Sequence, residues 1–428
     1  MRTGTAWAAL AVAAVTLFLL ATSAALAQTD EERRLEAIKA LPYVTWTEKD
    51  VDEKEHGVTH YDSLLAYDGY TLYVGKTHAT LVDMVGDEVH TWSNPELKRL
   101  EHVKMMEDGH VYVLLPRDGV YELDWEGNVV WSAEAAVHHD FDITPEGDVL
   151  AVAHDEVAMR GFGPMTVVSD RIVRLRRDGT ATDLWRLHEH RDQLARWCSE
   201  EALNSVSDDV PEDDWSHMNT VEIIRGDGVS SLSTSPHGPE GASGGGAAAA
   251  SGAPVHGGLS GRDEVESRHP AFRPGNVLIC VRNLDFVGVV DLDSGEIVWG
   301  WGPGEIDHPH QPTLLGNGNI LLFDNGFFRG WSRIVEYDPV AEEIVWEYKG
   351  ADPFDFYSRG RGACQKLPNG NVLVTESAKG RVFEVTPDGE TVWDFYNPSR
   401  QSARRGTFYR SFRYDREFID ALLSERAD

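Results

Sequence analysis

A hairpin signal preceded by two histidines runs from residue 307 to residue 326, with the sequence Asp307-His308-Pro309-His310-Gln311-Pro312-Thr313-Leu314-Leu315-Gly316-Asn317-Gly318-Asn319-Ile320-Leu321-Leu322-Phe323-Asp324-Asn325-Gly326. Apolar runs flank Asn317-Gly318, and this dipeptide supplies the positive φ angles that a tight primed turn requires. The stretch therefore predicts a β-hairpin over residues 314–323, with His308 and His310 just before its first strand.

Most of the chain repeats this pattern. Similar hairpins are expected at residues 64–74, 103–115, 141–152, 314–323 and 365–374, and a further one is divided between residues 221–224 and 276–282. A second hairpin follows each of these and ends on a tryptophan: Trp92, Trp131, Trp185, Trp299, Trp346 and Trp393. Four strands per unit, and the equal spacing of the last three tryptophans, are typical of propeller blades. The sequence therefore predicts an all-β fold, a six-bladed β-propeller with four-stranded blades, over residues 43–398.

The N-terminus resembles an export signal. One basic residue, Arg2, precedes an apolar run, and Ala25-Leu26-Ala27 has the small residues of a cleavage site. Residues 1–27 are therefore interpreted as a secretory signal peptide, with an uncleaved N-terminal membrane anchor as the alternative. We expect an exported protein that is secreted, periplasmic or anchored at the outer face. Its odd number of cysteines excludes a pure disulfide framework and leaves either three free thiols or one bridge, among Cys198, Cys280 and Cys364.

Three further segments lie outside the repeat. Residues 189–206 have a polar face and predict an inserted helix. Residues 226–270 are rich in Gly, Ala and Ser, a composition that buries too little apolar surface to fold, so a disordered loop is expected. Residues 399–428 read as a tail with basic residues followed by a short helix.

The chain is strongly acidic. It carries 71 Asp and Glu against 39 Lys and Arg, and its formal net charge is −32. Nucleic acid and anionic membranes are therefore excluded as partners of the surface as a whole. This acidic surface also resembles that of halophilic proteins, in which salt screens the repulsion between carboxylates. A melting temperature that rises between low and molar salt tests this hypothesis. The sequence leaves the oligomeric state open.

Histidines recur where inner strands begin. In a propeller these strand starts converge on one mouth of the central channel. His139 and His310 each lie the same number of residues before their turn glycines, Gly147 and Gly318, so they occupy equivalent blade positions. A lone histidine at a strand start is usually structural, but recurrence in register favours function. The polar residues at these starts are His102, His139, His217, His308, His310, Arg359 and Arg361.

Three chemistries suit such a cluster. A metal ion could be held by His308 and His310 together with His139 or His217, because neutral imidazole is a common ligand; this would be a metal-dependent hydrolase. Histidine can also shuttle protons in a hydrolase or lyase. The third chemistry is nucleophilic attack by an imidazole on an anionic group, with arginines stabilising the charge.

Four phrases resemble the bacterial and archaeal arylsulfotransferase family over about residues 61–398. They are Asp214-Trp215-Ser216-His217-Met218-Asn219-Thr220-Val221, Val281-Arg282-Asn283, the His310 stretch quoted above, and Leu367-Pro368-Asn369-Gly370-Asn371-Val372-Leu373. The resemblance implies a six-bladed propeller that moves a sulfo group from an aryl sulfate to a phenol through a sulfohistidine. It implies no adenosine phosphosulfate or other cofactor, no metal, and small-molecule partners. A non-catalytic ligand- or protein-binding propeller is the alternative.

The resemblance also implies roles for individual residues. His310 matches the nucleophile, His217 a second histidine that assists the leaving oxygen, and Arg282 an arginine that offsets sulfonyl charge. Well-characterised members carry a histidine after this arginine, whereas this chain has Asn283, which can donate a hydrogen bond but carries no charge. Three further substrate-binding candidates come from position and not from the resemblance: His139 by blade register, and His308 and Arg361 by their places at strand starts.

Overall fold

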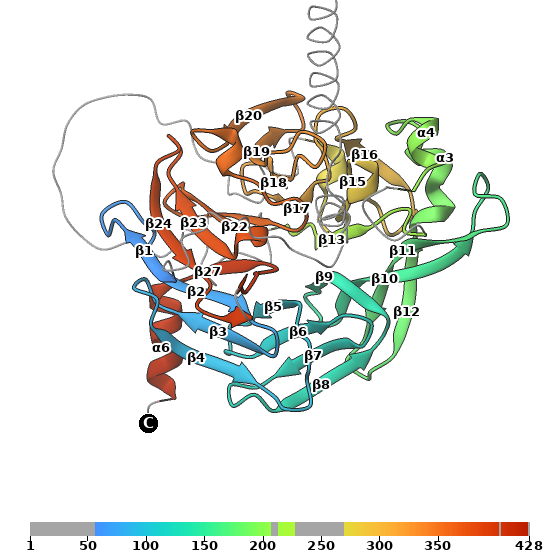
Figure 1. Cartoon of the computed structure of the whole chain (residues 1–428). Coiled ribbons are helices and arrows are strands. Elements are labelled where there is room, and N and C mark those ends of the chain that lie inside the picture. The colour runs from blue at the N-terminus through green and yellow to red at the C-terminus, as the bar shows by residue number, and fades with distance from the viewer. Residues whose placement is uncertain (1–55, 207–212, 227–268, 402–403, 427–428) are drawn as a thin grey trace, which may run out of the picture. The chain divides into compact units, whose positions relative to one another are not determined.

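The computed structural model describes residues 56–206, 213–226, 269–401 and 404–426. These residues form six antiparallel sheets that follow one another around a central axis (Figure 1). Five sheets have four strands, and the sixth has a fifth strand at its outer edge. The predicted six-bladed propeller with four-stranded blades is therefore confirmed. The predicted signal peptide and the greater part of the predicted disordered loop lie outside the described residues.

The blades are numbered here in chain order, and each is given from its innermost strand outward. Blade 1 is β27 (Ser411–Asp415), β2 (Gly69–Val74), β3 (His78–Val82) and β4 (Glu88–Ser93). Blade 2 is β5 (His102–Met105), β6 (Val111–Leu115), β7 (Gly119–Leu123) and β8 (Val129–Glu134). Blade 3 is β9 (Val137–Ile143), β10 (Val149–Ala158), β11 (Thr166–Leu175) and β12 (Ala181–Arg186).

The remaining blades follow the same order. Blade 4 is β13 (Met218–Ile223), β14 (Val277–Val281), β15 (Phe286–Val290) and β16 (Ile297–Trp301). Blade 5 is β17 (His310–Leu314), β18 (Ile320–Asp324), β19 (Arg333–Asp338) and β20 (Glu343–Tyr348). Blade 6 is β21 (Ala363–Lys366), β22 (Val372–Glu376), β23 (Arg381–Val385), β24 (Thr391–Tyr396) and β1 (Gly57–Tyr61). A separate small ribbon joins β25 (Arg400–Gln401) to β26 (Arg404–Arg405).

Blade 1 departs from the sequence prediction. The expected hairpin over residues 64–74 does not form, and the innermost strand of this blade is β27, from the C-terminal tail. The physical reason is burial: Phe412 in β27 is 1% exposed, whereas Leu64 is 92% exposed. The tail also ends in the helix α6 (Arg416–Glu425), whose Ile419 and Leu422 pack into the core of blade 1. Because β1 pairs with β24, the first and last blades each take a strand from the opposite end of the chain.

The repeated tryptophans hold neighbouring blades together. The indole N–H of four of them donates a hydrogen bond to a backbone carbonyl in the next blade. These bonds run from Trp131 to Arg177 (3.1 Å), Trp185 to Gly295 (2.9 Å), Trp346 to Pro387 (2.8 Å) and Trp393 to Met84 (2.9 Å). A tryptophan at the end of a blade therefore contributes both apolar area and one directional contact across the blade boundary.

Polar side chains on the inner strands make a second set of contacts between blades. Each of these side chains accepts a backbone N–H from the innermost strand of the following blade, and we call them the inner-strand acceptors. They are Asp140 to Val221 (3.1 Å), Asp142 to Ile223 (2.9 Å), Glu222 to Leu314 (3.0 Å), Gln311 to Cys364 (2.9 Å) and Gln365 to Arg413 (2.8 Å). Buried polar groups are thus satisfied along the channel, as a folded interior requires.

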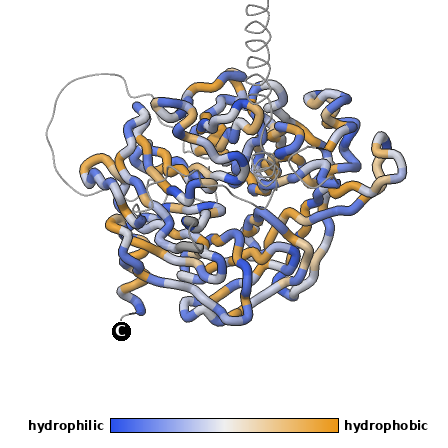
Figure 2. The backbone as a smooth tube through the Cα atoms, in the orientation of Figure 1, coloured by the Kyte–Doolittle hydropathy of each residue, from blue (hydrophilic) through white to orange (hydrophobic). Residues whose placement is uncertain are grey.

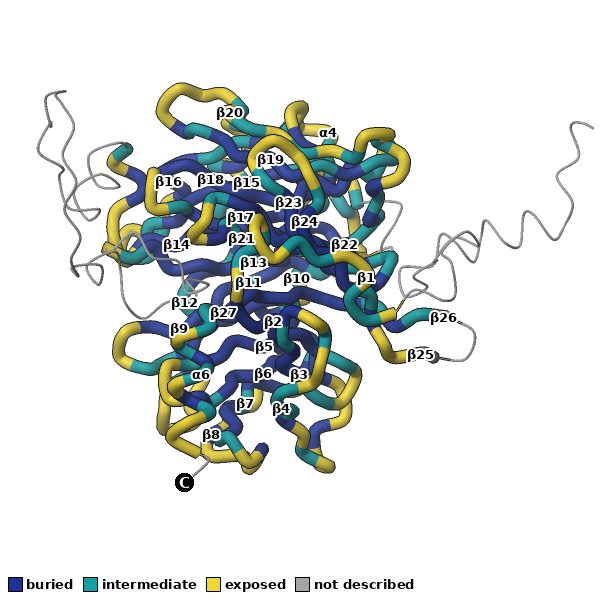
Figure 3. Tube along the Cα trace, turned by 90° about the vertical axis from the view of Figure 1, so that its left-hand side faces the viewer, coloured by how far each residue is buried: buried dark blue, intermediate teal, exposed yellow. Residues whose placement is uncertain are grey.

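Burial follows the strands (Figure 3), and hydrophobic and hydrophilic stretches alternate along the backbone (Figure 2). The predicted inserted helix is helical, but it consists of short pieces: the 3₁₀ turn η1 (Leu187–His190), α3 (Arg191–Leu194) and α4 (Glu200–Leu203). Gln193 in α3 accepts a hydrogen bond from the backbone N–H of Ile297 in blade 4 (2.7 Å).

All three cysteines are buried free thiols. None of the described helices has the length and apolar character to span a membrane.

Candidate active site

Four neighbouring blades begin their inner strands with an unusual backbone. His139, His217 and Arg361 have φ values of 61°, 50° and 64°, and Gln311, directly after His310, has a φ of 46°. Non-glycine residues adopt this left-handed region at an energetic cost, which is often found at functional sites. The ladders of blades 3, 4 and 5 also shift register beside these residues. Such bulges turn side chains away from the regular alternation of a strand, and here they occur at equivalent places in successive blades.

His310 is held in one tautomer. Its side chain is buried, and its Nδ1 lies 2.7 Å from Oδ1 of Asn325. The amide of Asn325 donates to the carbonyls of Ser358 (2.7 Å) and Arg361 (2.6 Å), so its oxygen faces His310 and must accept. Nδ1 of His310 therefore carries the hydrogen, and Nε2 has the lone pair, to which the backbone N–H of Arg361 donates at 3.2 Å. Burial, followed by the charge of Arg282, lowers the pKa of His310 well below its ordinary value.

His217 and His139 form a pair across two blades. Their Nε2 atoms are 3.1 Å apart, a distance at which one nitrogen donates a hydrogen bond to the other. On its other side, Nδ1 of His217 lies 2.5 Å from Oδ2 of Asp214, whose Oδ1 accepts the backbone N–H of His217. The carboxylate of Asp214 therefore fixes the orientation of the His217 ring.

Arg282 and Asn283 join this pair. Both lie in the 3₁₀ turn η4 (Arg282–Leu284), and Nη1 of Arg282 donates to Oδ1 of Asn283 (2.8 Å). The amide of Asn283 donates in turn to the backbone carbonyl of Asp214 (3.0 Å), and the backbone N–H of Arg282 donates to the carbonyl of His217 (3.3 Å). Asn283 thus links Arg282 to the backbone of Asp214 through two hydrogen bonds. The guanidinium of Arg282 places positive charge close enough to His310 to influence its pKa.

Two residues of the C-terminal tail also contribute to the site. Arg410 is 3% exposed; its Nη1 pairs with Asp140 (2.9 Å), and its Nη2 donates to the carbonyl of Asn219 (2.7 Å). The ring of Tyr409 lies parallel to that of His139, with 5.9 Å between their centroids. These residues directly precede β27, so the strand that completes blade 1 also brings aromatic and cationic groups to the strand starts.

The side chain of His308 belongs to a different group. Its Nδ1 is 2.8 Å from Oδ1 of Asp307 and 3.4 Å from Oδ1 of Asp285, and its ring stacks on Phe327 at 4.7 Å. Nδ1 of His310 turns instead to Asn325. The nitrogens of the two histidines therefore do not form a common ligand set.

Two groups in the described part of the chain have the donors to hold a metal ion. They are Asp285, Asp307 and His308, and His138, His154 and Asp170. Neither includes His139, His217 or His310. The metal-dependent alternative therefore has no ligand set among these three histidines in the described residues.

The structure brings together His139, His217, Arg282, Asn283, His310 and the backbone of Arg361, while His308 faces elsewhere. Four contributing residues were not assigned a role from sequence: Asp214, Asn325, Tyr409 and Arg410. Asp214 and Asn325 stand inside the phrases that carry the family resemblance, so their proximity to His217 and His310 was an available signal. No sequence pattern linked Tyr409 and Arg410 to the site.

The family model described as arylsulfotransferase (ASST) matches residues 102–398, which is more than half of the chain. Similar solved structures include a protein of unknown function from Bacteroides caccae (11% identity, TM-score 0.48, covering 81% of this chain and 99% of that one). A streptogramin B lyase (11%, TM-score 0.42, 82% and 85%) and the WD40 propeller domain of Doa1 (8%, TM-score 0.41, 81% and 84%) are also similar.

At these identities and TM-scores, the solved structures contribute nothing to the functional conclusion. A search of curated proteins finds no match. The family match covers blades 2 to 6 and includes every residue grouped above except those of the C-terminal tail. The resemblance of the four sequence phrases is thereby confirmed, and this protein belongs to the arylsulfotransferase family, as a transferase of sulfo groups.

Proposed function

We propose that this protein moves a sulfo group from an aryl sulfate to a phenol through a covalent intermediate on Nε2 of His310. The observation that carries the proposal is the state of this side chain. It is buried, its Nδ1–H is held by Asn325, and its lowered pKa keeps Nε2 unprotonated at neutral pH. An imidazole in this state is a ready nucleophile.

In the first half-reaction, Nε2 of His310 attacks the sulfur of the aryl sulfate in place of its long contact to the Arg361 N–H. The N–S bond forms, the bond from sulfur to the aryl oxygen breaks, and the aryl oxygen leaves with the electron pair. His217 is suited to give an Nε2 proton to this oxygen, because Asp214 holds its Nδ1 and thereby orients its Nε2. The products are sulfo-His310 and a neutral phenol.

In the second half-reaction, a phenol binds where the first product left. His217, now neutral at Nε2, takes the phenolic proton, and the phenol oxygen attacks sulfur while the N–S bond breaks. This step restores neutral His310 and protonated His217. His139, whose Nε2 lies 3.1 Å from that of His217, keeps the His217 ring in position between the two steps.

Positive charge favours an anionic donor at this site. Arg282 and Arg410 both act on the pKa of His310, so their fields reach the reacting nitrogen. Charge that develops on the sulfonyl oxygens is stabilised by such fixed cations in a buried site. The hydrogen bond from Arg282 to Asn283 keeps the guanidinium in place in a chain that lacks the second histidine expected after the arginine.

A chromogenic aryl sulfate tests the proposal. Phenolate release is measured while donor and phenol are varied, and double-reciprocal plots with parallel lines are expected, because the donor product leaves before the acceptor reacts. Intersecting lines would contradict a covalent intermediate. Absence of release above the protein-free rate would instead favour the non-catalytic binding propeller.

A further inference from the structure

One hydrogen lies between the paired rings of His139 and His217. Their Nε2 atoms are 3.1 Å apart, so one nitrogen donates and the other accepts. On the far side of His217, Nδ1 faces Oδ2 of Asp214, an oxygen that accepts, so this nitrogen carries a hydrogen of its own. Which ring holds the hydrogen between the two Nε2 atoms therefore depends on the tautomer of His139.

Glu101 faces the other nitrogen of His139. It directly precedes β5, the innermost strand of blade 2, and its Oε1 lies 3.8 Å from Nδ1 of His139. The backbone N–H of Glu101 donates to the carbonyl of Leu114 (2.9 Å), which fixes the residue against the neighbouring strand. The side chains of Glu101 and His139 are 10% and 17% exposed. Among the described residues, no other ion pair involves this largely buried carboxylate.

His139 is a neutral ring, and its single hydrogen can sit on either nitrogen. Burial, the largest cause, together with His138 and His217, lowers the pKa of His139 well below its ordinary value. A neutral imidazole has one N–H and one lone pair. An anionic oxygen attracts the N–H and repels the lone pair, so Glu101 favours hydrogen on Nδ1. The separation exceeds a direct hydrogen bond, so the carboxylate acts through its charge, which is weakly screened between two largely buried groups.

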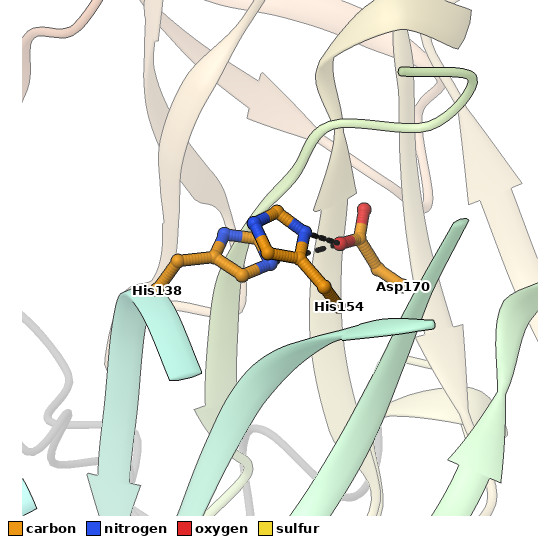
Figure 4. A group of neighbouring side chains, drawn as sticks. All are labelled: His138, His154 and Asp170. Atoms are coloured by element: carbon orange, nitrogen blue, oxygen red, sulfur yellow. Dashed lines mark hydrogen bonds and ion pairs between the residues drawn. The ribbon is translucent and has the colours of Figure 1, made fainter. Parts of the chain in front are cut away.

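The aromatic neighbours of His139 do not set this choice. The ring of Tyr409 lies parallel to it, and the ring of His138 meets it at 80° with 4.8 Å between centroids. His138 is engaged elsewhere: its Nε2 is 2.9 Å from Oδ1 of Asp170, and its ring stacks on that of His154 (Figure 4). Among the described residues, Glu101 is the one carboxylate within ion-pair distance of the His139 ring.

We propose that Glu101 is a positioning residue for the sulfo transfer proposed above, on which this inference rests. Glu101 holds the hydrogen of His139 on Nδ1, so the lone pair on Nε2 of His139 accepts from Nε2 of His217. The hydrogen between the rings then belongs to His217, the residue that gives a proton to the aryl oxygen. Two carboxylates, Asp214 and Glu101, thus fix the outer ends of the histidine pair.

This arrangement serves proton transfer in both half-reactions. In the first, the Nε2 hydrogen of His217 leaves its contact with His139 and moves to the aryl oxygen as the bond from sulfur to that oxygen breaks. Two Nε2 lone pairs then face each other, which is an unfavourable contact. In the second, the proton of the acceptor phenol returns to Nε2 of His217, while the phenol oxygen takes the sulfo group from His310. The cycle neither gains nor loses a proton, and Glu101 exchanges none.

Nitrogen NMR on the full chain with isotope-labelled histidine tests the tautomer without any substrate. The signals of His139 are assigned by their absence in His139→Gln. In the wild type we expect a hydrogen on Nδ1 and a lone pair on Nε2. Glu101→Gln removes the charge at nearly constant shape and should move part of this hydrogen to Nε2, and circular dichroism establishes that the variant is folded. Hydrogen on Nε2 in the wild type, or an unchanged tautomer in Glu101→Gln, would overturn the proposal.

Two aryl sulfate donors test the effect on the reaction. Phenyl sulfate has a poor leaving group that needs a proton, whereas para-nitrophenyl sulfate releases a stable anion. We compare kcat/KM for the donor, which includes only the steps up to release of the first phenol. Glu101→Gln should lower it about tenfold with phenyl sulfate, a part of the ~10²–10⁴-fold that proton transfer contributes, and less than about threefold with para-nitrophenyl sulfate.

Glu122→Gln is the matched control. Glu122 pairs with His110 at 2.8 Å in the same blade, outside the candidate active site, so its variant should leave the ratio between the two donors unchanged. An equal loss with both donors in Glu101→Gln would indicate a general structural effect and overturn the role in proton transfer. Failure of the wild type to use either donor would instead contradict the sulfo transfer, while the NMR result still decides the tautomer.

Discussion

Two sets of polar side chains lie on or directly before the same inner strands, and they make different contacts. The inner-strand acceptors, such as Asp142 and Glu222, bind backbone N–H groups of the next blade. The histidines at the strand starts, His139, His217 and His310, instead contact other side chains: one another, the carboxylate of Asp214 and the amide of Asn325. A side chain that accepts a backbone N–H from the next blade stabilises the ring of blades. A histidine that is held in one tautomer, with a lone pair on its other nitrogen, can act in a reaction instead.

Removal of His310, the proposed nucleophile, should show the difference between the two sets of side chains most clearly. His310→Ala is expected to lower phenolate release by at least about a thousandfold, because no other group replaces the attacking nitrogen. Its free energy of unfolding should change by less than that of an acceptor variant, as measured by urea denaturation. Retained turnover in His310→Ala would remove the distinction between the sets.

Loss of an inner-strand acceptor should lower stability and leave activity largely unchanged. Asp142 accepts from Ile223 and pairs with Lys104 (3.3 Å) and Arg225 (3.1 Å). Asp142→Ala removes the carboxylate between two cations, so the free energy of unfolding should fall by about 3–5 kcal/mol. Activity per folded molecule should remain close to that of the wild type. A stable but inactive Asp142→Ala protein would place this residue in the reactive set instead.

Asn325 tests whether tautomer control matters. Asn325→Ala removes the acceptor of the His310 Nδ1–H and allows the hydrogen to move to Nε2. The loss of a buried hydrogen bond, about 1–3 kcal/mol, corresponds to a fall in kcat of roughly 5- to 150-fold. Full activity in this variant would show that the ring needs no fixed tautomer.

Among the inner-strand acceptors, Glu222 should make the free energy of unfolding depend on pH. Burial, the largest cause, raises the pKa of its carboxyl to about 8 from 4.5. Between these values the folded protein binds a proton that the unfolded chain has lost, so the contribution of Glu222 to stability falls as pH rises. Relative to Glu222→Gln, the wild type should lose at most ~1.4 kcal/mol per pH unit across this window. Unfolding curves that remain parallel from pH 4.5 to 8 would contradict this.

Arg410 should have the smallest effect. Burial and Arg282 are the larger causes of the low pKa of His310, and Arg410 adds to them. Arg410→Gln should raise this pKa and move the acid limb of the kcat/KM profile upward, by at most about one pH unit. Arg416→Gln, which alters a partly exposed pair with Asp68 in the same tail, is the control and should leave the limb unchanged.

Much of the fold could be read from the sequence because its signals are local. The Asn317-Gly318 turn and the recurring tryptophans each report on a single blade, and their repetition gives the number of blades. The closure of blade 1 was not predictable in this way. It pairs Tyr70 with Tyr414 and Leu72 with Phe412, far apart in the chain, and the apolar residues 64–66 offered a nearer but wrong partner.

The residues of the candidate site were likewise predictable where the sequence signal is local and not predictable where it depends on long-range pairing. His310 and His217 were identifiable because register repeats and family phrases mark them. Arg410 was not, because its place depends on the long-range pairing of β27. His308 was kept beside His310 as a substrate-binding candidate, and the structure separates the two, because Nδ1 of His308 contacts Asp307 whereas Nδ1 of His310 contacts Asn325.

The central claim is a sulfo group on Nε2 of His310, and trapping it is the most direct test. The wild type and His310→Ala are mixed with an aryl sulfate in the absence of any phenol acceptor, quenched in alkali and digested for mass spectrometry. The account predicts the mass of one sulfo group on the wild-type peptide that contains His310, with the group leaving when phenol is added before the quench. Turnover with phenol but no modified His310 peptide, or the same modification in His310→Ala, would contradict it.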